Sequence, residues 1–406
     1  MEAPRFTIII PTRERAATLE HSLRTVTAQQ FASLEIIVSD NCSTDNTRAV
    51  VEANGDPRIR YLNTGRRLSM SHNWEFALGH ARGEWVAFLG DDDALLPDSL
   101  AHVDAIARAH PVDLIRSRPG NFLWPSLVGA AGGHLSLPLG GRSGLRNCGA
   151  ALKSVLAGDK SYLELPTLYT GGYVRRAAID RARAADGRFF LSRIPDVYSA
   201  VILCATCEQY YWSARPLAIN GASLASTGTS QFTRSNDPER QRAERMFAQE
   251  DNIPLHASLP FNPDGSVPRS LQALVFESYQ QARAVHPIFG PLDPAQQMAA
   301  IARTAAEHRD EIAAWLRDFA VLNGVKQVPE PMLAQRLHNA FAYARLAWMD
   351  RLIFYPDRDP PITDIAQASR IGGEALAAAP SPMLAVARNT VRRIGRALGK
   401  TATAAD

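Results

Sequence analysis

The sequence lacks the features that mark membrane-spanning, secreted and nucleic-acid-binding proteins. No apolar run reaches the roughly 20 residues that a transmembrane helix needs. The N-terminal stretch MEAPRFTIIIPT lacks the basic start, long apolar region and small-residue cleavage site of a secretory signal. The formal net charge is only +3, too small to indicate a nucleic-acid partner. We therefore expect a cytoplasmic protein that binds no nucleic acid.

Cysteines are few, and two common glycine motifs are absent. The 4 cysteines form no disulfide framework, which suits a reducing compartment. Cys204 and Cys207 have the spacing of half a zinc site, but the sequence holds no second CxxC pair, so we interpret them as ordinary core cysteines. The patterns GxGxxG and GxxxxGK do not occur, which argues against a dinucleotide enzyme and a P-loop protein.

Strand and helix patterns alternate along the first 117 residues. The strand-like runs are RFTIII, LEIIVSD, RIRYLN, EWVAFLG and VDLIRS, and amphipathic helical patterns separate them. This alternation predicts an α/β fold with a doubly wound, mostly parallel sheet and helices on both faces. In such sheets ligands bind beyond the carboxyl ends of the strands, where Pro11, Asp40 and Asp91 lie.

Beyond Asn236 the composition changes to a Pro-rich stretch and then to helical periodicity. The expected helices are Ser270–His286, Asp293–Asn323 and Pro331–Tyr355. The predicted organisation is an α/β domain over 1–235, a Pro-rich linker over 236–268, a helical domain over 269–356, a linker over 357–380 and a basic amphipathic tail helix over 381–406.

Three adjacent acids, Asp91, Asp92 and Asp93, directly follow the apolar run EWVAFLG. Adjacent like charges repel and resist burial. A hard divalent cation would remove that cost, because it takes carboxylate oxygens as ligands. Two further interpretations of the cluster stay open: an acid and base acting on one substrate, and solvated acids that cap the next helix.

Several motifs in chain order resemble those of the family 2 glycosyltransferases of the GT-A fold. They are IIIPTRERAATL, LEIIVSDNCSTDNT and NWEFALGHARGEWVAFLGDDDALLPDSL. The resemblance covers roughly residues 5–230, and residues 5–105 most specifically. It implies an inverting, hexosyltransferase-like enzyme of bacterial surface-polysaccharide or O-antigen synthesis. Such an enzyme moves a sugar from a nucleoside-diphosphate-sugar to a hydroxyl of a glycan or lipid-linked glycan.

The resemblance also implies a nucleotide-sugar site. Asp40 and Asn41 would meet the base edge, although Asn41 stands where the family often has a second acid, which leaves uracil specificity open. For Asp40 a helix-capping role is the alternative, and for Asn73 a helix-surface amide. The full set implied to bind the donor is Pro11, Thr12, Arg13, Glu14, Asp40, Asn41, Asn73 and Asp91.

The implied metal site departs from the family pattern. Aligned on FLGDDDALLPD, the first acid of the family's Asp-X-Asp motif falls on Gly90, so the motif is shifted or shortened. The resemblance then implies Asp92 as the main ligand of Mn²⁺ or Mg²⁺. Asp93 would assist it directly or through water, and Asp91 would lie near the ribose.

A general base must take the acceptor's proton, and the resemblance implies an acid before a helix, about a hundred residues past the metal motif. Asp196 in SRIPDVYSAVIL fits this position. The rival is Asp186, whose Asp-Gly pair favours a turn, and a helix-cap role for Asp196 stays open.

The acceptor side is expected in the segment TGGYVRR and in the loop that follows residue 220. Gly171, Gly172 and Tyr173 would form an acceptor wall, unless the two glycines only make a turn. The stretch from Gly221 to Ser230 is either a lid over the donor or a plain connector.

The tail helix has two interpretations. Its apolar residues face one side and its arginines the other, as in a helix at the inner membrane surface that would hold the enzyme near lipid-linked acceptors. Alternatively the tail packs on the helical domain or frays.

Two other classes of function are alternatives to sugar transfer. A phosphohydrolase with Asp91 as nucleophile predicts a Ser or Thr shortly after the acids, and DDDALLPD has none in place. A non-catalytic nucleotide- or glycan-binding protein remains the main alternative because of Gly90 and Asn41.

Overall fold

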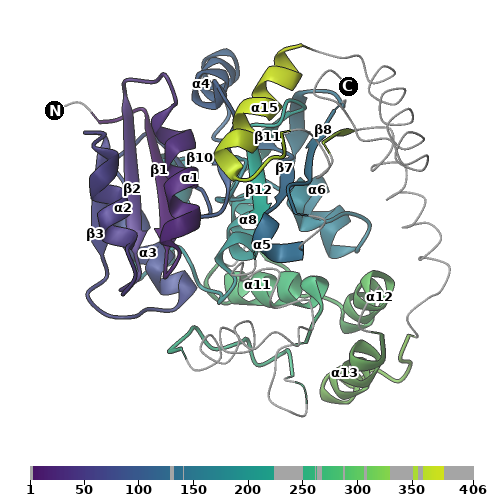
Figure 1. The fold of residues 1–406 in the computed structure, drawn as a ribbon. Helices are drawn as coiled ribbons and strands as arrows, with labels where there is room; N and C mark the ends of the chain where they lie inside the picture. The colour runs from purple at the N-terminus through teal and green to yellow at the C-terminus, as the bar shows by residue number, and fades with distance from the viewer. Residues whose placement is uncertain are drawn as a thin grey trace.

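The computed structural model describes residues 3–128, 132–139, 141–223, 250–260, 262, 268–286, 289–305, 309–329, 351–354 and 360–378. Two β-sheets lie at the centre of the fold, with helices around them (Figure 1). The predicted tail helix over 381–406, residues 224–230 of the expected lid and residues 331–350 of the third expected helix lie outside the described residues.

The first sheet has eight strands in the order β3-β2-β1-β4-β10-β6-β11-β9. β3, β2, β1 and β4 are parallel, β10 runs antiparallel to both of its neighbours, and β9 is antiparallel to β11. Their bounds are β1 (Phe6–Thr12), β2 (Leu34–Asp40), β3 (Ile59–Asn63), β4 (Trp85–Phe88), β6 (Leu114–Ser117), β9 (Gly144–Asn147), β10 (Gly172–Arg175) and β11 (Gln209–Ser213). The predicted α/β class with a mostly parallel sheet is confirmed.

Both faces of this sheet are buried, because side chains alternate along each strand. On β1, Ile8 and Ile10 pack in one apolar cluster and Ile9 packs in another. The helices of the first cluster are α1 (Ala16–Thr27), α2 (Thr47–Asn54) and α4 (Ser99–Ala109). The second cluster draws on α3 (Met70–His80), α6 (Cys148–Leu156), α7 (Arg176–Arg181) and α8 (Pro195–Thr206).

The buried residues of α8 include Cys204, and Cys148 packs in the same cluster. Cys207, just beyond the helix, is partly buried against it. All of the cysteines are free thiols, so the interpretation of Cys204 and Cys207 as core cysteines agrees with the structure.

The second sheet has five strands in the order β13-β8-β7-β12-β5. They are β5 (Ala94–Leu95), β7 (Gly120–Leu123), β8 (Leu135–Pro138), β12 (Ala218–Ala222) and β13 (Arg351–Phe354); the short α5 (Pro125–Val128) follows β7. β5 follows directly on the acid cluster in the chain. β12 follows β11, which is a strand of the first sheet. This sheet therefore brings residue 221 beside residues 91–93.

Two predictions fail in this region. Arg351–Phe354, expected at the end of a helix, pairs with β8 as a strand. The linker expected over 357–380 contains helix α15 (Ile365–Ala377), which packs on the second sheet and on α1. Asp364 caps this helix by accepting from the backbone N–H of Gln367 at 2.8 Å, and the Ser369 hydroxyl donates to the Leu95 carbonyl at 2.6 Å.

The helical region after residue 268 is confirmed, with one division. It contains α11 (Leu271–Val285), α12 (Pro294–Thr304) and α13 (Arg309–Asn323), so the stretch expected as one helix from Asp293 to Asn323 forms two. Figure 1 shows the three helices grouped at the lower end of the molecule. α11 places Leu274 and Val275 in the apolar cluster of α8, whereas Trp315 of α13 belongs to a separate cluster with α12. Among the described helices, none is both long enough and apolar enough to span a bilayer.

Candidate functional site

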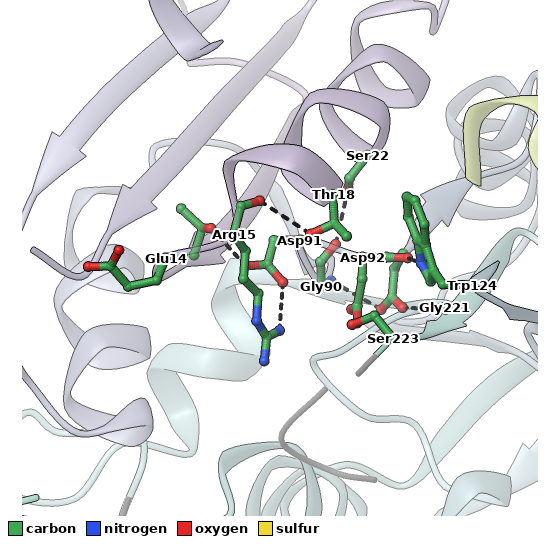
Figure 2. A network of polar contacts seen from close by, with 12 residues as sticks. Glu14, Arg15, Thr18, Ser22, Gly90, Asp91, Asp92, Trp124, Gly221 and Ser223 are labelled. Carbon is green, nitrogen blue, oxygen red and sulfur yellow. Dashed lines mark hydrogen bonds and ion pairs between the residues drawn. The ribbon is translucent and has the colours of Figure 1, made fainter. Parts of the chain in front are cut away.

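The three acids lie at the carboxyl end of β4, in the turn that leads to β5. Their residues are almost fully buried, with 3% of Asp91, 4% of Asp92 and none of Asp93 exposed. Figure 2 shows Asp91 directed at Arg15 and Asp92 next to Ser223. Three buried carboxylates in one turn require compensating partners, and the structure supplies different partners to each.

Asp91 is held by the turn that follows β1. Its two carboxylate oxygens accept from the Thr12 hydroxyl at 2.7 Å and from the Arg15 guanidinium at 2.9 Å. Burial raises the pKa of Asp91. Burial alone would lower the pKa of Arg15, but the Asp91 and Asp92 carboxylates outweigh it and the pKa of Arg15 is raised. Thr12 and Arg15 are thus both partners of the acid cluster, a contact that the sequence analysis did not predict for either residue.

Asp93 is held on the opposite side, by the second sheet and the segment before β10. Its oxygens accept from the Gly221 N–H at 2.7 Å, from the Gly90 N–H at 3.1 Å and from the Thr170 hydroxyl. Tyr169 also hydrogen-bonds to it. Burial, followed by the charge of Asp92, raises the pKa of Asp93 to about 7. Gly221 and Ala222, expected to begin a loop, belong to β12, and this strand fixes Asp93.

Asp92 is the acid whose charge acts on both of its neighbours, Asp91 and Asp93. One carboxylate oxygen accepts from the Ser223 hydroxyl at 2.7 Å, and its main-chain carbonyl accepts from the Trp124 indole at 3.0 Å. Its negative charge contributes to the raised pKa of both Asp91 and Asp93. A cation beside Asp92 would relieve repulsion across the whole cluster, so the residues fit a hard divalent ion.

The described residues contain no cluster of three or more His, Cys, Asp or Glu side chains arranged to hold a metal ion. Mg²⁺ bound to a nucleotide needs no such cluster, because one or two carboxylates share it with the phosphates.

Gly90 stands where the alignment puts the first acid of the family motif. A Cβ atom at this position would lie 2.7 Å from Asp93 Oδ2 and 2.8 Å from the Tyr169 hydroxyl. The space that a first acid would need is thus taken by Asp93, which folds back and is held by four donors. That the metal motif is shifted or shortened stays a prediction.

We expect that Gly90→Asp, which restores the family spacing, lowers the free energy of unfolding by about 3 kcal/mol or more. The new side chain must displace Asp93 or Tyr169, and it adds a buried charge. Chemical denaturation measures this effect. Gly79→Ala is the control, since nothing lies within 4 Å of a Cβ there. A Gly90→Asp protein as stable as the wild type would contradict the packing explanation.

The turns that follow β1 and β2 are bonded to one another. The Glu14 backbone N–H donates to the Ser43 hydroxyl at 2.9 Å, and the Glu14 carboxylate accepts from the Thr44 N–H at 2.8 Å. Glu14 and Cys42 both have positive φ, 54° and 60°, which is uncommon for these residue types. This paired geometry places Pro11 to Glu14 beside residues 40–45 at one sheet edge.

Asp40 and Asn41 are buried, and both side chains are bonded within the protein. Asp40 accepts from the Tyr61 hydroxyl at 2.5 Å and from the Ser43 N–H at 2.9 Å. The Asn41 amide donates to the Leu68 carbonyl at 2.7 Å and accepts from the Leu68 N–H at 2.8 Å. These contacts shape the turn at the sheet edge, and contact of either residue with a base stays a prediction.

Asn73 and Arg13 differ in their surroundings. Asn73 is buried on α3 and accepts from the Ser39 hydroxyl at 2.7 Å, so the alternative of a helix-surface amide is wrong. Arg13 forms an ion pair with Glu250, whose side chain is 5% exposed and lies 3.6 Å from the Arg67 guanidinium. The pairing of Glu250 with Arg13 could not be predicted from a local pattern, because the two residues are 237 positions apart.

Asp196 lies in the first turn of α8, as predicted, and its carboxylate accepts from the Tyr162 hydroxyl at 2.7 Å. Burial raises the pKa of Asp196. The charges of Asp93, Asp92 and Asp196 all act on the Tyr169 hydroxyl. Tyr169 hydrogen-bonds to Asp93, and the Thr167 hydroxyl of the same segment donates to the Asp196 carbonyl at 2.9 Å, so one short segment contacts both the acid cluster and Asp196. Asp186, the rival base, is exposed and paired with Arg188.

All three residues of the expected acceptor wall are buried. Tyr173 is 1% exposed and packs against Phe6 in the core, because β10 turns this side chain into the sheet's buried face. We therefore remove Tyr173 from the acceptor site. Gly171 has φ +83°, and a Cβ on Gly172 would lie 1.8 Å from the Thr167 carbonyl, so close backbone packing requires both glycines.

The comparison with known proteins finds a family match over part of the chain. Residues 7–120 match the profile described as Glycosyl transferase family 2. The matched segment comprises β1 to β6 and includes the acid cluster and the turns that follow β1 and β2.

Curated relatives also match only part of the chain. One, from Campylobacter jejuni, is named GalNAc(5)-diNAcBac-PP-undecaprenol beta-1,3-glucosyltransferase and is 41% identical over 101 residues, which is 24% of this chain and 33% of the relative. A PGL/p-HBAD biosynthesis glycosyltransferase of Mycobacterium bovis is 35% identical over 138 residues, or 30% of this chain and 52% of the relative. The matches thus span a third to about half of these relatives' lengths.

Among solved structures, S. aureus TarS 1-349 in complex with UDP-GlcNAc aligns over 79% of this chain and 83% of its own. The sequence identity is 13% and the TM-score is 0.46.

Proposed function

We propose that the protein is an inverting, metal-assisted glycosyltransferase that uses a nucleoside-diphosphate-sugar as donor. The observation that carries this proposal is that one short segment contacts both parts, through the Thr167 hydroxyl to the Asp196 carbonyl and the Thr170 hydroxyl to the Asp93 carboxylate. A charge-rich corner for a diphosphate thus lies next to a partly buried carboxylate that can take a proton. The matched family and the names of the relatives support the same class of reaction.

The donor's diphosphate is proposed to bind at the carboxyl end of β4. Asp92 would hold Mn²⁺ or Mg²⁺ there, and the ion supplies positive charge to the departing diphosphate. Asp91, fixed by Thr12 and Arg15, orients the donor next to it, and Pro11, Arg13 and Glu14 line the adjoining turn. Asp93 is proposed to position Asp92, since its own oxygens already hold β12 and Thr170.

Asp196 is proposed as the general base. It takes the proton of an acceptor hydroxyl while that oxygen bonds to the sugar's anomeric carbon and the bond to the diphosphate breaks. The nucleoside diphosphate leaves with the electron pair, and attack from the face opposite to it inverts the configuration.

The acceptor is proposed to be a glycan or lipid-linked glycan, as the name of the Campylobacter relative suggests. The protein would then work in the cytoplasm, with its basic tail at the inner membrane surface. A phosphohydrolase with Asp91 as nucleophile is less well supported, because both Asp91 oxygens are bonded, one of them to a guanidinium.

A panel of UDP-, GDP-, dTDP- and CMP-sugars tests the proposal. With one diphosphate donor we expect release of the free nucleotide that rises at least tenfold on addition of Mn²⁺ or Mg²⁺ and falls after chelation with EDTA. The same diphosphate should raise the melting temperature only with metal present. Stabilisation without turnover would instead favour a non-catalytic binding protein, and phosphate release from a simple ester would favour a phosphohydrolase.

A further inference from the structure

Tyr162 donates a short hydrogen bond to the proposed base. Its hydroxyl lies 2.7 Å from Oδ2 of Asp196. Tyr162 opens the 3₁₀ helix η2 (Tyr162–Glu164), which the side chain of Ser161 caps by accepting from the Leu163 N–H. The tyrosine approaches Asp196 from an element separate from α8. One oxygen of the carboxylate is thereby fixed by a neutral donor.

A buried arginine lies behind this contact. Arg116 of β6 is 1% exposed, and its guanidinium donates to the Thr170 carbonyl at 2.7 Å and to the Leu163 carbonyl at 3.2 Å. Burial lowers the pKa of Arg116 to about 10, so it stays charged at neutral pH. A buried charge held by two carbonyls is costly to maintain, which argues that it has a specific role.

The two carbonyls lie at the ends of one segment, residues 163–170. Next to one end, Tyr162 bonds to Asp196. At the other end, the Thr170 hydroxyl bonds to Asp93 of the acid cluster. Arg116 therefore joins both ends of the segment that connects the proposed base to the proposed donor site, and it fixes the spacing between them.

We propose that Tyr162 and Arg116 are positioning residues that hold the Asp196 carboxylate at a fixed place and orientation relative to the acid cluster. This inference rests on the proposed role of Asp196 as base. Tyr162 holds Oδ2, and the backbone N–H groups of Asp196 and Val197 also bond to the carboxylate, so its orientation is set from two elements. A misplacement of about 1 Å is enough to cost roughly a hundredfold in rate.

The groups that act electrostatically on Asp196 from neighbouring elements are Tyr162, Arg116 and Tyr169. Burial raises the pKa of Asp196, and the Tyr162 hydrogen bond and the Arg116 charge oppose that rise. Removing the Tyr162 hydroxyl withdraws a donor to the ionised form, so the pKa of Asp196 should rise further.

The test is Tyr162→Phe in the full chain, labelled with ¹³C at the aspartate carboxyls. The resonance of Asp196, assigned from its loss in Asp196→Asn, should titrate at higher pH in Tyr162→Phe than in the wild type. Tyr279→Phe is the control. Tyr279 lies on α11, and its hydroxyl makes a comparable hydrogen bond to the Gly290 carbonyl at 3.1 Å. An unchanged Asp196 titration in Tyr162→Phe would overturn the proposal.

Turnover of the donor selected by the panel gives a second readout. Tyr162→Phe should lower kcat about tenfold with little change in donor KM, and the acidic limb of its pH–rate profile should move to higher pH. Arg116→Lys keeps the charge but cannot span both carbonyls, so it should lose kcat as well. If Arg116→Lys retains wild-type kcat, the charge alone suffices and the spacing role is wrong.

The two levels of the account fail in different ways. If Asp196→Asn turns over the donor like the wild type, the proposed base is wrong. If Asp196→Asn is inactive while Tyr162→Phe keeps both the wild-type titration and the wild-type rate, only the positioning proposal fails. Mn²⁺-dependent stabilisation by UDP, or by the diphosphate that the panel selects, should be retained in Asp196→Asn, Tyr162→Phe and Arg116→Lys. None of these substitutions removes a group proposed to hold the donor.

Discussion

Asp196→Asn should lower the turnover number for sugar transfer by roughly 10²–10⁴-fold, the usual contribution of a general base. The amide keeps the shape of the side chain but cannot take the acceptor's proton. Nucleotide binding should persist, because Asp196 is not among the residues proposed to hold the donor. Steady-state rates with the donor selected by the panel measure the loss. Asp186→Asn is the matched control, since this exposed acid pairs only with Arg188 among the described residues.

The pH dependence follows from the same carboxyl group. Burial raises the pKa of Asp196, and the base must be ionised to accept a proton. The ratio kcat/KM should therefore fall as pH drops through that raised pKa, and it should level off above it. If Asp186→Asn, rather than Asp196→Asn, removes this acidic limb, the base has been assigned to the wrong acid.

Asp92→Asn should lower the metal-stimulated rate by roughly 10²–10³-fold, because it removes the charge that holds the cation against the departing diphosphate. It should also abolish the Mn²⁺-dependent rise in melting temperature with nucleoside diphosphate. The variant should fold, since relief of the repulsion on Asp91 and Asp93 offsets the weakened contact with Ser223.

Asp98→Asn is the control for Asp92→Asn. Asp98 is an exposed acid just beyond β5. Its φ is 59°, a conformation that asparagine tolerates, and its side chain makes no capping bond to α4. Asp98→Asn should retain wild-type rates and metal response. Equal losses in both variants would show that general charge near the loop, and not a specific ligand, accounts for the effect.

The sequence was sufficient to predict the first sheet because its signals are local. Apolar runs such as EWVAFLG end at the acids, and parallel strands bring their carboxyl ends to one edge, so Pro11, Asp40 and Asp91 were expected at that edge. The bond from the Thr12 hydroxyl to Asp91 at 2.7 Å is a detail that only the structure shows. The position of Asp196 at the start of a buried helix also followed from a local pattern, Pro-Asp before an apolar run.

The supporting residues could not be predicted, because their roles depend on contacts between distant segments. Arg116 acts on carbonyls 47 and 54 residues away, and no local pattern marks a buried arginine. Arg15 directly follows the predicted turn after β1. A basic residue at the same sheet edge as three acids was the signal that could have identified it as their partner. Helix α15 was missed because Gly372 and Gly373 read as helix breakers.

These two glycines have a packing role that only the structure shows. A Cβ on Gly373 would lie 2.6 Å from Pro97, and one on Gly372 would lie 3.0 Å from Leu137. The absence of side chains thus lets α15 lie close against the second sheet. The same reasoning applies to Gly90, where Asp93 and Tyr169 take the space that a Cβ atom would need.

The most direct test of the account is a crystal of the wild-type protein grown with Mn²⁺ and the nucleoside diphosphate selected by the panel. The account predicts an anomalous manganese peak bonded to the Asp92 carboxylate and to the diphosphate. A diphosphate bound elsewhere, or manganese held without Asp92, would contradict it.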